Sequence, residues 1–287
     1  MMLYKWLFSI LFLLFITLAS FIYFEHTRSI QTITYFPIDT NTSFTTASTQ
    51  IALTSEKDQQ PYNISWTSQS KSNKQVYLRQ DASILFANGR LKGVSSKWQE
   101  NTDKIYLKKE LSCENSSYFQ AISFHYGEVH YPEDKIKSIQ QMSHDALYVA
   151  NSPTVPIEPF STPQNRFTAE WKEKLDTTTK QQLIYHWNEL MQHFQIASGD
   201  YHSIPLTSLY LYNERSLPAM SQAQTDQIIG KLWEGLYKNY IIPATSGTSQ
   251  LESSYIPLVL VAKDRTHLLV LFQLDGKKEK LIQRIGN

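Results

Sequence analysis

The sequence predicts an α+β protein: an N-terminal transmembrane helix, an antiparallel β-rich half, and then two helices with a C-terminal antiparallel meander. Three observations predict this fold class. A long uncharged apolar run lies within residues 1–28. Residues 62–150 contain strand-like runs of β-branched and aromatic residues, with a hairpin signal between two of them. Beyond residue 166 the apolar positions take a helical period, and strand-like runs then return.

The transmembrane helix is predicted from Trp6 to Phe24, a run without charge. Nineteen helical residues span roughly 28 Å, which is close to the hydrocarbon thickness of a bilayer. The best cleavage site, Thr17-Leu18-Ala19, lies inside this run. We therefore expect residues 1–28 to be an uncleaved signal anchor in the cell membrane. A cleaved signal peptide and a buried helix of a soluble protein are the alternatives.

The orientation of the anchor rests on few charges. Lys5 precedes the span and Arg28 follows it, so the free N-terminal amine decides for a cytoplasmic N-terminus. The bulk of the chain is then extracytoplasmic. Cys113, the one cysteine, can form no internal disulfide and is expected to be a small buried apolar residue; a reactive or metal-binding role is the alternative.

The composition restricts the classes of function. The chain has 27 basic and 26 acidic residues, so it lacks the charge excess of nucleic-acid-binding proteins and of proteins that bind anionic lipid heads. It has only nine glycines and no glycine-rich phosphate loop or nucleophile elbow. Nucleotide enzymes and α/β-hydrolases are therefore disfavoured, no cofactor is predicted, and no nucleic-acid partner is expected.

The region after the anchor is predicted to begin with residues 29–61, which are rich in Ser and Thr. They form either a stalk or the first strands, because "ITYF" (33–36) and "QIAL" (50–53) alternate as strands do. Residues 62–150 are predicted to be antiparallel β, with strands at "YNISW", "KIYLKKEL", "YFQAISFHY" and "DALYVA". Asn88-Gly89 lies between two apolar runs, and this dipeptide is typical of a two-residue hairpin turn.

Residues 151–166 carry four of the eleven prolines and are predicted to be a linker. Proline fixes φ and removes a hydrogen-bond donor, so neither a helix nor an inner strand is expected there. The alternative is a proline-rich crossing between two halves of one domain.

Residues 167–287 are predicted to be an α+β region. A first helix is expected from the apolar stripe Leu183, Trp187, Leu190 and Phe194, with Asp176 or Thr177 as its cap. The stretch 206–212 is strand-like. A second helix is expected to begin at Ser221, where Gln224 completes a capping box. Three strands follow at 256–262, 267–274 and 280–285; the first two are apolar on both faces, so we expect both faces to be covered, one of them by the two helices.

The first candidate site is His186, Glu189 and His193, in "IYHWNELMQHF". A helix turns about 100° per residue, so these side chains share one narrow face and could hold zinc or act as an acid/base pair. That face lies roughly 100° from the apolar stripe, so we favour a solvated polar face for all three. A zinc site would need a further ligand, for which His202 is a guess.

The second candidate site is "SFHYGEVHY", which contains His125, Glu128 and His130. With a turn at Tyr126-Gly127, His125 and Glu128 would face each other across a hairpin mouth and could bind a ligand; a packed turn is the favoured alternative. Glu133 and Asp134 follow directly. Glycosidase carboxylates must flank a substrate, which neighbouring residues on a turn do not imply.

In composition the chain is similar to many bacterial envelope proteins, which have a signal anchor followed by an exported domain rich in Ser, Thr, Gln and Tyr and almost free of cysteine. We expect a single-pass membrane protein that presents an extracytoplasmic interaction or structural module to a protein or cell-envelope partner. The alternative is an envelope hydrolase or metal-binding enzyme that uses a His/Glu cluster.

Overall fold

The structure is a computed structural model that describes residues 34–56, 61–152, 155–246 and 253–286. Residues 33–287 form one compact unit. The predicted membrane span, Trp6 to Phe24, lies outside the described residues. Among the helices that are described, none combines the length and the apolar character needed to cross a bilayer.

The first sheet has six strands and accounts for most of the N-terminal half. They are β1 (Phe44–Leu53), β2 (Tyr62–Ala87), β3 (Arg90–Cys113), β4 (Ser117–His130), β5 (Ile136–Ser152) and β6 (Val155–Phe160). All pairings are antiparallel, in the order β1-β2-β4-β5-β6, with β3 on the other edge of β2. One edge of β2 is therefore shared between β1 along its first half and β4 along its second half.

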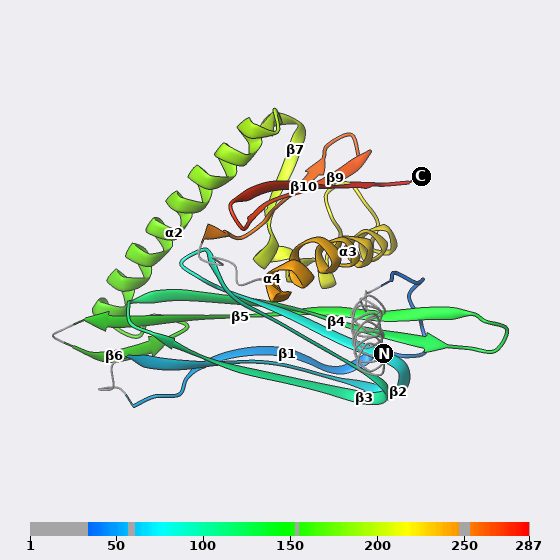
Figure 1. The fold of residues 1–287 in the computed structure, drawn as a ribbon, viewed down its shortest axis with the longest axis horizontal. Coiled ribbons are helices and arrows are strands. Elements are labelled where there is room, and N and C mark those ends of the chain that lie inside the picture. Colours follow the sequence, from blue (N-terminus) through cyan, green and yellow to red (C-terminus); the bar gives the residue numbers. More distant parts are fainter. Residues whose placement is uncertain (1–33, 57–60, 153–154, 247–252, 287) are drawn as a thin grey trace, which may run out of the picture. The chain divides into compact units, whose positions relative to one another are not determined.

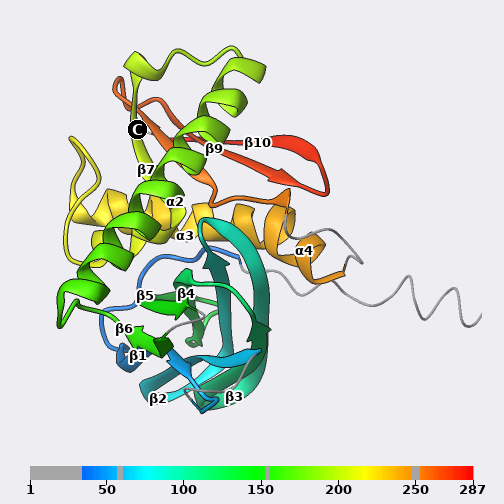
Figure 2. The ribbon, with the colours of Figure 1, turned by 90° about the vertical axis from the view of Figure 1, so that its left-hand side faces the viewer.

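The sheet curls because the long β2–β3 hairpin is irregular where its pairing passes from Lys71 to Val76. The two halves of the β2–β3 hairpin lie in different layers, and β1 comes to lie against β5 (Figures 1 and 2). Side chains join these two strands: Thr49 Oγ1 lies 2.6 Å from Ser143 Oγ, and the Ile51 amide donates to Asp145 Oδ2 at 2.7 Å. The stretch "YNISW" and the apolar run that precedes Asn88-Gly89, predicted as separate elements, are parts of the single strand β2.

The predicted hairpin turn at Asn88-Gly89 is confirmed. Both residues have positive φ, 50° and 78°, as a two-residue turn between twisted strands requires. A Cβ added to Gly89 would lie 3.0 Å from Cδ2 of Leu183, so the turn also needs glycine for close packing against a helix.

The helical elements follow β6, which itself occupies part of the predicted Pro-rich linker as an edge strand paired with β5 alone. They are α2 (Arg166–His193), the 3-10 helices η1 (Ser198–Asp200) and η2 (Leu206–Asn213), α3 (Gln222–Leu236), the π-helical turn η3 (Tyr237–Ile241) and α4 (Ile242–Ser246). The Ser221–Gln224 capping box is confirmed at the start of α3.

Two predictions about the helical region are wrong. The first helix begins at Arg166, capped by Asn165, rather than at Asp176 or Thr177. Its first half buries Thr168 and Thr179 as well as Leu175, so the apolar period fades there although the helix continues. Residues 206–212, predicted as a strand, lie in the helix η2, because a short apolar run has no period that separates strand from helix.

The second sheet contains the predicted meander. β8 (Leu258–Ala262), β9 (His267–Leu274) and β10 (Lys277–Arg284) are antiparallel neighbours, and β7 (Tyr201–Pro205) adds to the edge of β8. Its two faces are covered by different helices rather than both helices lying on one face. Leu258, Leu260, Leu269 and Leu271 pack with Leu190 of α2, whereas the alternate residues join the core around α3.

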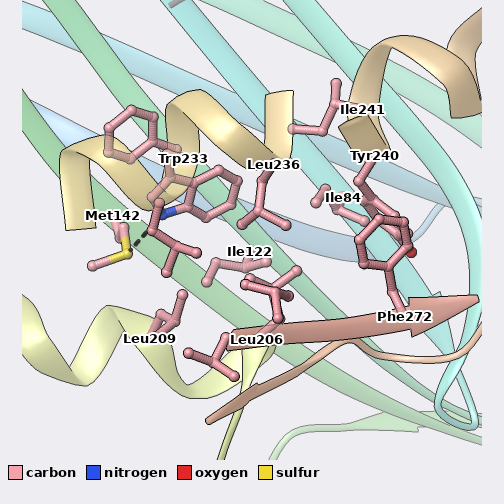
Figure 3. Close-up of a cluster of buried hydrophobic side chains, with 14 of the residues drawn as sticks. Ile84, Ile122, Met142, Leu206, Leu209, Trp233, Leu236, Tyr240, Ile241 and Phe272 are labelled. Carbon is pink, nitrogen blue, oxygen red and sulfur yellow. Dashed lines mark hydrogen bonds between the residues drawn. The ribbon is translucent and has the colours of Figure 1, made fainter. Parts of the chain in front are cut away.

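The main apolar core lies around α3, between the two sheets (Figure 1). Trp233 is fully buried, its ring stacks on Phe124 of β4 at 5.0 Å, and its indole N–H donates to the sulfur of Met142 (Figure 3). Tyr240 meets Phe272 of β9 edge-to-face at 5.2 Å. One aromatic-rich layer thus joins both sheets into a single unit.

Candidate functional site

The predicted cluster on α2 does not come together as a site. His186 is buried, and its ring stacks on Tyr255 with 4.5 Å between centroids. Glu189 is exposed and pairs with Lys278, with 2.6 Å between Oε1 and Nζ, and His193 is exposed beside Phe194. The prediction that all three face solvent is therefore wrong for His186. Tyr255, far away in the sequence, covers that flank of the helix.

Burial lowers the pKa of His186 and outweighs the nearby Glu189 carboxylate, which acts to raise it. The ring therefore packs as a neutral aromatic group, and its Nε2 has no hydrogen-bond partner in the described part of the chain. His202, the guessed further ligand, is an exposed residue of β7. None of this resembles a ligand set.

The second predicted cluster is also divided. Tyr126-Gly127 lies inside β4 and is not a turn; the chain reverses at residues 131–135, where Glu133 and Asp134 are exposed with φ of 62° and 53°. The prediction that His125 and Glu128 face each other is wrong, because side chains three apart on a strand point to opposite faces.

Glu128 and His130 do share a face, with 3.4 Å between Oε2 and Nε2, and His130 stacks on Tyr77. Burial raises the pKa of Glu128, while the bond to His130 opposes the rise. Within the described ranges, no group of three or more His, Cys, Asp or Glu side chains is placed to hold a metal ion.

His125 instead belongs to a buried polar network inside the curl of the first sheet. Its Nδ1 lies 2.7 Å from Asp81 Oδ2, and its Nε2 lies 2.7 Å from Ser143 Oγ. Asp81 also accepts from Ser70 at 2.6 Å, and Arg79 donates to Ser70. Arg79, Asp81 and His125 have no exposed surface.

The network continues across the curl as a line of hydroxyl groups. Ser143 meets Thr49, Thr49 donates to Ser123, and Ser123 meets Ser83, each at 2.6 Å. The indole of Trp66 donates to Ser83 at 2.9 Å and ends the line. Strands β1, β2, β4 and β5 all contribute, so the network binds the curl together.

The buried guanidinium of Arg79 interacts with nearby carboxylates and with an aromatic ring. Burial lowers its pKa, and the carboxylates of Asp81 and Asp103 raise it. Nη2 lies 3.8 Å from Asp81 Oδ1, and the guanidinium lies over the Phe44 ring at 4.7 Å. A Cβ at Gly127 would come within 3.0 Å of the Arg79 side chain, so glycine provides the space that this buried cation needs.

The order Asp81–His125–Ser143 is the order of bonds in a Ser-His-Asp triad, in which histidine takes the serine proton and the carboxylate orients histidine. However, the Ser143 hydroxyl is already bound by His125 and by Thr49, and β1 lies over it. A substrate carbonyl must approach such a hydroxyl closely. In this arrangement the three groups serve to close the sheet.

A hollow of about 490 Å³ that is open to solvent lies on the same half of the first sheet. Lys71 of β2 and Lys97 and Lys104 of β3 line it, with Thr46 and Tyr106 among the uncharged residues. Ser70 lines it too, so the hollow adjoins the buried polar network. No carboxylate from the described residues contributes to its wall. We call this the lysine hollow.

Comparisons with protein-family models, curated proteins and solved structures find no match to this chain. Function is therefore inferred from the geometry of the network and the hollow.

Sequence reasoning missed both features, although a signal for the network is visible. Tyr62, Ile64 and Trp66 occupy every second position, and Ser68, Ser70 and Ser72 continue the same face; all six are buried. A strand face that passes from apolar to hydroxyl side chains indicates a polar interior. Asp81, a charge followed at once by the apolar run "ASILF", was the other signal.

Proposed function

We propose that the chain is a single-pass membrane protein that presents residues 34–286 outside the cytoplasm as an interaction module for a protein or envelope partner. The anchor is the uncharged run from Trp6 to Phe24. The observation that carries the proposal is the contrast between the network and the hollow. Asp81 and His125 of the network have no exposed surface, whereas three lysines line a hollow that is open to solvent and has no acidic side chain among its described lining residues.

This contrast supports binding over catalysis. A catalytic group must reach its substrate, but Asp81 and His125 have no exposed surface. A binding surface needs accessible polar groups in a concave setting, and Lys71, Lys104 and Tyr106 provide them.

The binding proposal is tested by photo-crosslinking in living cells that express the full-length chain. Tyr106 in the lysine hollow and Tyr185 on α2 are both exposed, at 53% and 75%, so each accepts a benzoylphenylalanine without disturbing the core. We expect adducts from position 106 that are absent from position 185. Equal labelling at both positions, or none at position 106, would overturn the assignment of the binding surface.

The anchor is tested by fractionation. We expect the chain to stay with membranes after a high-salt wash, to keep its N-terminus, and to be digested by protease added outside spheroplasts. A shortened form in the medium beginning near Ser20 would show a cleaved signal instead, and protection from the protease would reverse the orientation.

A serine hydrolase is the second candidate, favoured by the Asp81–His125–Ser143 geometry alone. It requires β1 to move and expose Ser143. A fluorophosphonate probe reports this, because the serine oxygen displaces fluoride to form an O–P bond while the histidine takes the proton. Labelling that is lost in Ser143→Ala and kept in Ser123→Ala would favour the hydrolase. We expect no labelling of the wild type.

A further inference from the structure

The lysine hollow brings like charges together across the sheet. Lys71 of β2 and Lys104 of β3 are direct partners in the strand register. Like charges placed directly opposite each other in an antiparallel pair destabilise it. Lys97 of β3 adds a third ammonium group to the same hollow. The fold therefore maintains a local repulsion between Lys71 and Lys104, and no carboxylate of the described residues lines the hollow.

The three lysines lack partners that other lysines of the chain possess. Among the described residues, no ion pair involves Lys71, Lys97 or Lys104, although each is exposed. By contrast, in the hollow between α3 and β10, Lys238 pairs with Glu234 at 2.8 Å. The charged residues that line the lysine hollow are thus all basic, whereas those of the hollow between α3 and β10 include both signs.

Protection of a sheet edge does not explain this arrangement. Lysines on an edge strand prevent pairing with another chain, and this accounts for Lys97 and Lys104, because β3 is an edge strand. Lys71 lies in the interior of the sheet, with Thr46 of β1 on one side and Lys104 of β3 on the other. An interior lysine opposite an edge lysine gives no such protection.

We infer that the lysine hollow binds a phosphate-bearing ligand. A phosphate monoester carries close to two negative charges, a phosphodiester carries one, and both offer several strong acceptor oxygens that can satisfy converging ammonium groups. Hydroxyl and amide groups of Thr102 and Gln99 line the same wall and can complete the contacts. The volume of about 490 Å³ exceeds that of a lone phosphate and falls in the range of small-molecule sites.

This inference rests on the proposed function and names the chemistry of its ligand. The phosphate can belong to a soluble molecule or to a lipid headgroup. The near-neutral composition gives no sign of such a site, because 27 basic and 26 acidic residues balance over the chain while the charged residues lining this hollow are all basic.

The test uses the full-length chain in a nonionic detergent at low salt, with inorganic pyrophosphate as the probe in titration calorimetry. We expect binding that weakens by about tenfold or more in the Lys71→Gln/Lys104→Gln double variant, as the loss of charge-assisted contacts implies. The matched control is Lys180→Gln/Lys277→Gln, which removes the same charge from exposed positions elsewhere and should change affinity less than about twofold.

Folding of the variant is checked by its melting temperature, which should not fall, because the substitution removes a repulsion. Absence of binding to the wild type, or an equal loss in both double variants, would overturn the inference. If crosslinks form at Tyr106 while pyrophosphate fails to bind, only the ligand chemistry is wrong; if neither occurs, the proposed function fails as well.

A second arm distinguishes the source of the phosphate. Mixed micelles containing phosphatidylglycerol are compared with phosphatidylcholine micelles as competitors of pyrophosphate. Competition by phosphatidylglycerol alone supports a lipid headgroup, and its absence supports a soluble phosphorylated ligand.

Discussion

The two faces of the same strands in the first sheet are stabilised in different ways. On β4, Ser123 and His125 point into the curl, whereas Ile122 and Phe124 point toward α3. The inner face is a hydrogen-bonded polar network at its centre. The outer face is apolar and aromatic, and it joins the core around Trp233.

Alternate residues of one strand can thus point into two different buried interiors, one polar and one apolar. Apolar burial stabilises the fold roughly in proportion to the area buried, and an apolar core tolerates some change in the shape of its side chains. A buried polar network depends on every partner being present, because an unpaired buried group costs more than a bond contributes. Substitutions on the two faces should therefore fail in different ways.

The largest effect is expected on the apolar face. Trp233→Ala removes a fully buried indole that touches Phe124 and Met142, and it should lower the free energy of unfolding by about 3–5 kcal/mol. Denaturant unfolding measures this loss. Tyr185→Ala, on the exposed side of α2, should change it by less than about 0.5 kcal/mol. Similar losses in the two variants would show that α3 is not the centre of the core.

On the polar face, Asp81→Asn should cost about 3 kcal/mol, because it leaves Arg79 buried beside a neutral group. The distinguishing test is the double variant Arg79→Met/Asp81→Asn. If the stability of the network depends on the opposite charges of Arg79 and Asp81, replacing Arg79 as well should restore part of the lost stability rather than add to the loss. Additive losses would mean that the inner face behaves as ordinary packing.

The strand content was predictable because local signals and tertiary packing agree. The Asn88-Gly89 turn, the Ser221–Gln224 capping box and the C-terminal meander each depend on neighbours in sequence. The curl was not predictable, since it depends on the irregular pairing between Lys71 and Val76, and on contacts of β1 with β5 some 94 residues apart.

The candidate sites were harder to predict than the fold. Proximity in sequence suggested His125 with Glu128, but strand parity separates them, and the true partners of His125 are 44 and 18 residues away. The lysine hollow combines Lys71 with Lys97 and Lys104, which only the folded hairpin places together. Overall charge cannot reveal such a local concentration.

A smaller effect is expected at Asp39, which ties the segment before β1 to the far end of the curl. Burial alone would raise its pKa, but hydrogen bonds from Thr42, Tyr131 and Lys137 lower it to about 2. A depressed carboxyl pKa stabilises the fold above the unfolded value near 4, and this contribution of about 2 kcal/mol is lost as the pH falls through 2.

Denaturant unfolding between pH 4.5 and pH 2 tests this contribution. The difference in stability between the wild type and Asp39→Asn should shrink by about 2 kcal/mol across the window. A constant difference would show that the charge of Asp39 contributes nothing through its ionisation.

The smallest effect is expected at His186 of α2, whose polar ring is buried against Tyr255. Its pKa is lowered by burial, so the unfolded chain takes up a proton more readily than the folded chain. The stabilising contribution of the neutral ring is present above the unfolded pKa of about 6.5 and is lost as the pH falls through the lower folded pKa.

His186→Phe keeps a ring against Tyr255 and removes an Nε2 without a described partner. At pH 7.5 it should therefore match or exceed wild-type stability by up to about 1 kcal/mol. Between pH 7.5 and 5 it should lose less stability than the wild type, while the half-buried His144, whose pKa is also lowered by burial, leaves a residual slope in both proteins. His193→Ala, on the exposed side of the same helix, should stay within about 0.5 kcal/mol of wild type at pH 7.5. If His186→Phe lost as much stability as the wild type over this range, the ring would be accessible to protons from solvent, and the stripe of α2 through Leu183, His186 and Leu190 would not be sealed.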